Sequence, residues 1–305
     1  MACSSQRASD LLPPARPLSA GGQRRRLART SILAGRSATA PRLRHGCKCN
    51  HELRAQGMVA APEIQALIDR DFPPETHPYR KLERVISNHM NAGSTILEIG
   101  CGREAPTLMR LRGRAKTLIG VDLIDFDNTS SDLLLINADV CNMSAVPSAS
   151  IDLSYSRSVM EHIKDVRGAF SEISRVLRPG GKYIFLTPNA WDYASIIAQL
   201  VPIRLHAKIV NMTEGRKKMD VFPTFYKSNT RRKIRKIARA NNFQLDHFEY
   251  LGQYPSYLTF SKPLFYLGSR YEKFLERHRH LHFLRGWILC VLSKRLSPDR
   301  PTAAT

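Results

Sequence analysis

The feature that most constrains this chain is a run of β-favouring apolar residues that ends in an acid and two glycines. It reads Thr95-Ile96-Leu97-Glu98-Ile99-Gly100-Cys101-Gly102, and the residues through Met109 that follow can start a helix. In open α/β sheets, ligands bind outside the carboxyl ends of the strands, and glycine lets the backbone of such a turn approach them closely. The run therefore predicts an open α/β fold with a ligand site at residues 98–102.

Two kinds of cofactor site fit this turn. A dinucleotide site is typical of the pattern G-x-G-x-x-G, and Gly100, Gly102 and Ala105 satisfy a tolerated variant of it. The acid two residues before the first glycine, Glu98, gives instead an E-x-G-x-G frame. This frame resembles motif I of the class I S-adenosylmethionine (SAM) methyltransferases, in which the acid acts on the methionine end and the glycines pass under the cofactor. The third glycine of that family would fall at position 104, where this chain has Glu104.

Two further apolar runs also end near an acid. The run Thr117–Leu123 contains Asp122, 20 residues after the second glycine, where a carboxylate can accept hydrogen bonds from a ribose diol. The run Leu133–Asp139 ends in an acid itself. The resemblance implies that Asp122 binds the ribose, and that Asp139 and the Val140 backbone hold the adenine ring. The alternative for each acid is a turn residue, because aspartate favours turns.

The run from 151 to 189 carries a second resemblance. An acidic strand start, Ile151-Asp152, is followed by the pair Glu161-His162, by the turn Arg178-Pro179-Gly180-Gly181 and by a fifth strand at Lys182–Pro188. These elements, in this order, resemble the type 11 methyltransferase subfamily. The helix between the pair and the turn is predicted from one apolar stripe: Val166, Ala169, Phe170, Ile173, Val176 and Leu177.

The resemblance also implies a set of cofactor contacts from the ends of four strands. Its members are Glu98, Gly100, Cys101, Gly102, Asp122, Leu123, Asp139, Val140 and Ser156. The implied cofactor is S-adenosyl-L-methionine.

Strands that alternate with helical segments predict a doubly wound parallel sheet, and hence an α/β protein. The resemblance implies the seven-stranded, Rossmann-like sheet of the class I methyltransferases, whose seventh strand is antiparallel. We expect its last two strands at Gln244–Leu251 and Tyr257–Ser261, after a basic helix at about 231–241. The charges of that helix are interpreted as a solvated face.

Composition divides the chain into regions. Residues 1–57 contain eleven Lys or Arg against two acids and few large apolar residues, which predicts a disordered tail. This tail is either similar to an organelle transit peptide or the product of a mis-assigned start, with Met58 as the alternative. Residues 58–261 are expected to form the methyltransferase domain, with a helical substrate-lid insertion at 189–229. Six scattered cysteines favour free thiols in a reducing compartment.

Residues 262–305 are predicted to form a basic, amphipathic, helical C-terminal extension. Residues 262–297 hold eight Lys or Arg against two Glu among many apolar residues. Such a segment can lie in a membrane interface, and the alternative is packing on the domain or in a dimer. We expect a cytoplasmic protein, at the inner face of a membrane if the interfacial interpretation holds. The oligomeric state stays open.

His162 is the candidate general base, because it follows the fourth strand and imidazole titrates near neutral pH. The alternative is a structural histidine in that turn. Some relatives carry E-x-x-E-H here and bind a divalent metal. This chain has Ser158 where the first Glu would stand, so no metal site is predicted.

The acceptor is constrained by a motif that is missing. Amino methyltransferases of nucleic acids carry Asn/Asp-Pro-Pro-aromatic after the fourth strand, whereas this chain reads Ser156-Arg157-Ser158-Val159. We therefore expect a SAM-dependent methyltransferase that O-methylates a small-molecule, glycan or lipid-linked acceptor. An RNA methyltransferase, favoured by the net charge of +21, and a non-catalytic SAM-binding scaffold are the alternatives.

Overall fold

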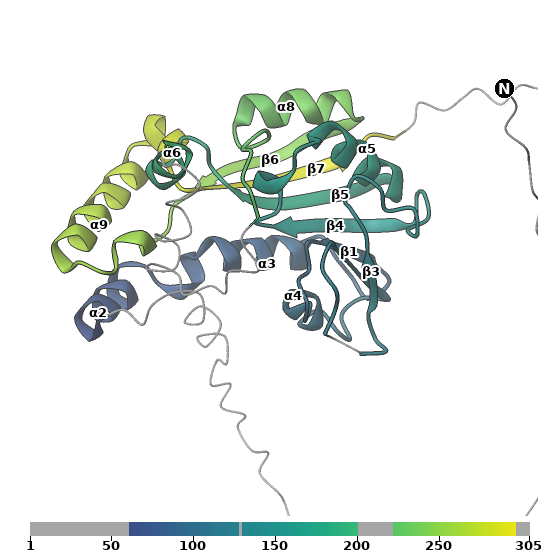
Figure 1. The fold of residues 1–305 in the computed structure, drawn as a ribbon, viewed down its shortest axis with the longest axis horizontal. Coiled ribbons are helices and arrows are strands. Elements are labelled where there is room, and N and C mark those ends of the chain that lie inside the picture. Colours follow the sequence, from purple (N-terminus) through teal and green to yellow (C-terminus); the bar gives the residue numbers. More distant parts are fainter. Residues whose placement is uncertain (1–60, 128–129, 201–221, 297–305) are drawn as a thin grey trace, which may run out of the picture. The chain divides into compact units, whose positions relative to one another are not determined.

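A computed structural model describes residues 61–127, 130–200 and 222–296, all within the unit formed by residues 48–305 (Figure 1). The predicted disordered tail at 1–57 lies outside the described residues, together with its alternative start at Met58. The central part of the predicted lid, residues 201–221, lies outside them as well.

A seven-stranded sheet in the order β3-β2-β1-β4-β5-β7-β6 organises the described residues. All neighbouring pairs are parallel except those of β7, which runs antiparallel to both β5 and β6. The predicted α/β, doubly wound, Rossmann-like sheet is confirmed. The strands are β1 (Thr95–Ile99), β2 (Thr117–Asp122), β3 (Leu134–Asn137), β4 (Ile151–Arg157), β5 (Leu177–Pro188), β6 (Phe243–Leu251) and β7 (Trp287–Lys294).

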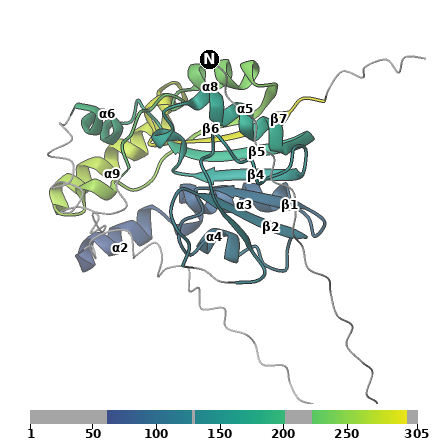
Figure 2. The same ribbon diagram turned by 45° about the vertical axis from the view of Figure 1, so that its right-hand side comes forward.

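Helices cover both faces of the sheet (Figures 1 and 2). On one face lie α5 (Val166–Val176) and α8 (Arg231–Ala240), and on the other lie α3 (Pro78–Asn88) and the short α4 (Pro106–Met109). The strand order reverses at β1, between β2 and β4. A ligand crevice is expected at the carboxyl ends of the strands at this switch point.

Helix α5 forms where its apolar stripe predicts it, except that Leu177 is the first residue of β5 rather than part of the helix. The Asp165 carboxylate caps its first turn by accepting the Gly168 N–H at 3.0 Å. Every residue of the predicted stripe is buried in the core on this face of the sheet. The basic helix α8 also forms as predicted and buries Ile234 and Ala238 against the same core.

The last strand is not where the sequence predicted it. Residues 257–261 lie in the 3₁₀ turn η4 (Ser256–Leu258) and in the connection to α9 (Lys262–Arg277), whereas β7 is formed by residues 287–294. Ile288 and Cys290 face one core, and Leu289 and Val291 face the other. A strand buried on both faces shows no polar alternation, so its apolar run resembles a helix segment.

This correction changes the domain boundaries. Helix α9 and the 3₁₀ helix η5 (Arg279–Leu284) are an insertion between β6 and β7, so the predicted C-terminal extension at 262–305 is wrong. Residues 287–294 are interior sheet, which excludes them from a membrane interface. Among the described residues, no helix has the length and apolar content needed to span a bilayer.

Candidate cofactor and acceptor site

The turn after β1 depends on both glycines, for different reasons. Gly100 and Gly102 have φ angles of +71° and +74°, in the region that favours glycine. A Cβ added at Gly100 would lie 2.3 Å from Val159 Cγ2, whereas one added at Gly102 would have nothing within 4 Å. The space above Gly102 is therefore open, while Gly100 is required by contact with this protein's own β4 loop rather than by a ligand alone.

Asp122 holds this turn against the end of β2. Its Oδ2 accepts the Gly102 N–H at 2.8 Å, and its Oδ1 accepts the N–H groups of Leu123 at 2.7 Å and Ile124 at 3.4 Å. A carboxylate can accept about four hydrogen bonds. Asp122 therefore positions the glycine turn and keeps capacity for one further donor.

Glu98 is the most unusual group of the site. Its side chain is 2% exposed, and its Oε2 has no hydrogen-bond partner. Burial raises the pKa of Glu98 to about 7, against the opposing effects of the nearby Arg157 guanidinium, the Tyr155 hydroxyl and the Leu108 N–H. Arg157 is in turn stacked over the Tyr79 ring, 4.7 Å from its centroid. A buried carboxyl group with an unpartnered oxygen fits a positively charged or donating group of a ligand.

The end of β3 lies beside the end of β2. The Ala138 N–H donates to the Asp122 carbonyl at 2.9 Å. Asp139 follows, with an exposed side chain whose Oδ1 accepts the Cys141 N–H at 2.8 Å, and Val140 is buried. Asp139 thus makes the turn contact of the alternative interpretation, and its side chain is exposed just beyond the carboxyl end of β3.

Two of the predicted contact residues have their side chains in the core. The Ser156 hydroxyl is buried and hydrogen-bonded to the Tyr183 hydroxyl at 2.8 Å. The Cys101 thiol packs against Gly120 of β2, and burial raises the pKa of this thiol far above its usual range. Only the backbones of Ser156 and Cys101 are therefore available to a cofactor.

A buried polar chain lies beyond β4 and β5. Glu161 Oε2 accepts the Thr187 hydroxyl at 3.0 Å, and Asn229 Nδ2 donates to Thr187 Oγ1 at 2.7 Å and to the Pro188 carbonyl at 2.8 Å. Asn229 Oδ1 is buried without a partner. The sequence analysis assigned no role to Thr187 or Asn229, because their contact joins segments 42 residues apart.

His162 lies next to Glu161 of this hydrogen-bonded group, in the 3₁₀ turn η2 (Met160–His162). Its Nδ1 is 3.0 Å from the Pro223 carbonyl oxygen, and its Nε2 is 3.9 Å from Glu161 Oε1. Because a carbonyl only accepts, Nδ1 carries the proton that is donated to Pro223. The ring meets Phe222 edge-on, with 6.1 Å between ring centroids.

Three charged side chains lie beyond the carboxyl ends of β5 and β6 and the amino end of β7. Asp192 precedes α6 (Tyr193–Leu200), Glu272 comes from α9, and Arg285 follows η5. Each has one buried atom without a partner: Asp192 Oδ1, Glu272 Oε2 and Arg285 Nε. Burial raises the pKa of Asp192 to about 6 and that of Glu272 to about 8, and the nearby Asp192 adds to the shift of Glu272.

Sequence reasoning missed this charged cluster because it placed α9 outside the domain. The cluster nevertheless packs against the end of β6. A Cβ added at Gly252, just after β6, would lie 2.8 Å from Glu272 Oε2 and 3.0 Å from Arg285 Nε. Tyr193 of α6 and Tyr271 of α9 pack edge-on, with ring centroids 5.9 Å apart.

Comparison with known proteins concerns the segment that runs from the glycine turn to β5. Residues 97–185, from β1 into β5, match a family model described as "Methyltransferase domain". A Mycolicibacterium smegmatis protein named "probable S-adenosylmethionine-dependent methyltransferase" is 31% identical over 121 residues, which are 38% of this chain and 47% of that protein. The sterol 24-C-methyltransferase of Pneumocystis carinii is 30% identical over 114 residues, 33% of this chain and 30% of that enzyme. The chain spans less than half the length of these curated relatives.

A solved structure is also similar. The S-adenosylmethionine-dependent methyltransferase of Mesorhizobium loti aligns with a TM-score of 0.46 and 15% identity, over 72% of this chain and 99% of that chain.

Proposed function

We propose that this chain, whose residues 97–185 are a class I, SAM-dependent methyltransferase domain, transfers a methyl group to a hydroxyl of a small-molecule, glycan or lipid-linked acceptor. The observation that carries the proposal is Glu98. It is a buried carboxyl group with an unpartnered oxygen, beside a glycine turn that is open above Gly102.

The cofactor contacts follow from the ends of three neighbouring strands. Glu98 receives the charged methionine end, and the backbone of Gly100–Gly102 passes under the cofactor. Asp122, next to Leu123, accepts a hydrogen bond from one ribose hydroxyl, which its remaining acceptor capacity allows. Asp139 and the Val140 backbone take the adenine ring. Of Ser156 and Cys101, only the backbone contributes, because both side chains are turned into the core.

Bound SAM supplies an activated methyl group on a sulfonium centre. The chain's own contribution is to align the acceptor hydroxyl with that group, and such orientation can account for roughly 7–11 kcal/mol of a reaction barrier. His162, whose Nδ1 is held by the Pro223 carbonyl, accepts on Nε2 the proton that the hydroxyl loses. Glu161, fixed by Thr187, orients and stabilises the imidazolium that results.

The acceptor side of the site is polar and buried. The chain from Glu161 through Thr187 to Asn229 offers the unpartnered Asn229 Oδ1 as an acceptor. Asp192 Oδ1 adds a second unpartnered acceptor. These groups suit an acceptor molecule that carries several hydroxyl groups, because unmatched buried polar atoms favour a ligand that satisfies them.

The membrane contact is proposed for α9 rather than for the whole of 262–297. One face of α9 is buried through Phe265 and Leu275, while Leu264, Leu267 and Phe274 are exposed, Leu267 to 66%. Exposed apolar side chains on a helix with basic residues suit an interfacial position. Such a position would bring the site to a lipid-linked acceptor at the inner face of a membrane.

Transfer of a radiolabelled methyl group from SAM tests the proposal. The full chain is incubated with free polyols, lipid-linked glycans or bulk RNA. We expect label in a hydroxylated acceptor, and a rate about 10²–10⁴-fold lower for His162→Gln with unchanged SAM affinity. His280→Gln, at an exposed histidine of η5, is the matched control.

Three outcomes would contradict parts of this account. Label in RNA alone would favour the RNA methyltransferase. SAM binding without transfer to any acceptor would favour the non-catalytic scaffold. Full activity of His162→Gln would exclude this histidine as the base.

A further inference from the structure

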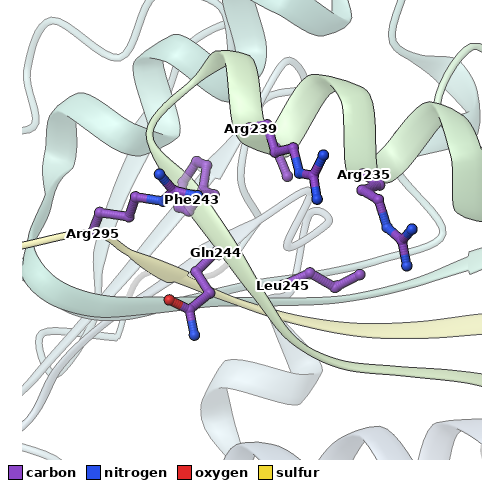
Figure 3. A pocket seen from close by; sticks show the side chains of 7 residues that line it. Arg235, Arg239, Phe243, Gln244, Leu245 and Arg295 are labelled. Atoms are coloured by element: carbon purple, nitrogen blue, oxygen red, sulfur yellow. The ribbon is translucent and has the colours of Figure 1, made fainter.

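A pocket of about 310 Å³ lies at the opposite edge of the sheet from Glu98 and the glycine turn (Figure 3). It is bounded by the last turns of α8, the start of β6 and the residue after β7, since Phe243 of β6 pairs with Lys294 of β7. This is the amino edge of the parallel strands, because β7 runs antiparallel to β5. The pocket is therefore separate from the proposed site of methyl transfer.

Three arginines line this pocket. In Figure 3, the side chains of Arg235 and Arg239 extend from α8 toward β6, and that of Arg295 extends from the end of β7 toward Phe243. The remaining lining residues are Ala238, Phe243, Gln244 and Leu245. No acidic side chain is among the lining residues.

The pocket is built on fixed backbone. Asn242, with a φ of +62°, makes the tight turn between α8 and β6, and its carbonyl accepts the Arg295 N–H at 2.9 Å. Asn241 caps the helix end, because its N–H donates to the Ala238 carbonyl and its Nδ2 to the Ile237 carbonyl at 2.8 Å. The carbonyls of Ile237, Ala238 and Asn242 are thus hydrogen-bonded within the protein.

The three arginines are exposed, and no acid of the described residues pairs with them. Within the part of the chain that the structure describes, the three guanidinium groups make no ion pair and no side-chain hydrogen bond. The acid of the neighbouring strand, Asp246, is engaged by Lys182 at 2.8 Å and by Ser293 at 2.9 Å.

A second pocket, between α2 (Pro62–Asp71) and α9, shows the contrast. There Asp71 lies between Arg70 and Lys273, at 2.8 Å from each, so the cations are neutralised within the protein. Their hydrogen bonds hold the pKa of Asp71 at about 2. Because the three arginines of the first pocket have no such acid beside them, we expect them to bind an anion that is not part of the protein.

We propose that Arg235, Arg239 and Arg295 bind the phosphate group of a ligand that is not the methyl acceptor. Guanidinium groups match phosphate oxygens in a two-pronged geometry, which makes arginine the preferred phosphate ligand of this kind. At about 310 Å³ the pocket is at the small end of ligand sites, so it suits one phosphate-bearing headgroup or small molecule rather than a polymer.

Calorimetric titration of the full chain with pyrophosphate, in a chloride buffer, tests the pocket. Loss of one charge-assisted contact should weaken binding about tenfold in Arg235→Gln and in Arg239→Gln. Arg232→Gln is the matched control, since Arg232 is an exposed arginine of α8 that does not line the pocket. All three variants should keep the wild-type melting temperature and SAM affinity, which separates this proposal from the proposed function.

Vesicles of phosphatidylcholine with and without phosphatidic acid distinguish the source of the phosphate. Cosedimentation that depends on phosphatidic acid, is competed by pyrophosphate and is lost in Arg239→Gln identifies a lipid headgroup. Pyrophosphate binding without cosedimentation identifies a soluble phosphorylated ligand.

Three results would overturn the proposal. One is the absence of binding to either probe. Another is equal weakening by Arg232→Gln and Arg239→Gln, which would mean a diffuse basic face. The third is tighter binding of a single-stranded RNA oligonucleotide that Arg232→Gln weakens as much as the pocket variants do, which would mean a nucleic-acid surface.

Discussion

Replacing Gly100 by alanine should disturb the site more than the same change at Gly102. Both residues have φ near +70°, so an alanine at either position costs roughly 1–2 kcal/mol of backbone strain. At Gly100 the new Cβ would also lie 2.3 Å from Val159 Cγ2, and forcing such overpacking costs about 1–3 kcal/mol more. We therefore expect Gly100→Ala to lose about 2–5 kcal/mol and Gly102→Ala about 1–2 kcal/mol.

Val159 links this strain to the acceptor side of the site. It directly precedes η2, which carries Glu161 and His162, so moving Val159 aside would shift both. Val159→Ala removes the clashing methyl group. The double variant Gly100→Ala/Val159→Ala should therefore regain about 1–3 kcal/mol relative to the sum of the single changes.

Urea denaturation of the four proteins measures these free energies of unfolding, and calorimetry measures their SAM affinity. The double-mutant comparison separates the steric contribution from the backbone contribution. Equal losses for Gly100→Ala and Gly102→Ala, or additive effects of Gly100→Ala and Val159→Ala, would refute the reasoning.

Three further predictions concern the core and the buried polar groups. The free energy of unfolding of the wild type should fall by about 3 kcal/mol relative to that of Glu98→Gln as pH rises from about 4.5 to 7. The reason is that the Glu98 carboxyl, with a pKa of about 7 in the folded protein, keeps a proton that it has lost in the unfolded chain. Urea titrations of both proteins across this pH range measure the difference. Asn229→Ala should cost about 1–3 kcal/mol in chemical denaturation by leaving Thr187 short of a partner, and an unchanged midpoint would contradict the buried chain. Cys290→Asp should prevent folding by circular dichroism, because β7 is buried on both faces; a folded variant would contradict the strand assignment.

The sequence predicted the half of the fold in which local patterns are unambiguous. The apolar run ending at Glu98 and Gly100 and the stripe of α5 each give a period or a turn signal that tertiary contacts did not override. It failed at β7, because a strand covered on both faces lacks alternation. With β7 misplaced, the insertion of α9 into the domain could not be seen.

The candidate site divides in the same way. The strand-end acids Asp122 and Asp139 were recognisable from position, because parallel strands bring their carboxyl ends to one edge. The contact of Gly100 with Val159, the chain through Thr187 and Asn229, and the cluster around Glu272 join segments far apart in the chain. No local pattern encodes such contacts, so only the folded arrangement reveals them.

Titration of the full chain with SAM, and with its demethylated product, tests the central claim most directly. The variant Asp122→Ala removes the carboxylate that fixes the glycine turn, and Asp125→Ala, three residues on and exposed, is its control. The account predicts one-to-one binding of both compounds, weakened by about 1–3 kcal/mol in Asp122→Ala and unchanged in Asp125→Ala. Absence of binding to the wild-type chain, or equal affinity of the two variants, would contradict a cofactor site at the carboxyl ends of β1 and β2.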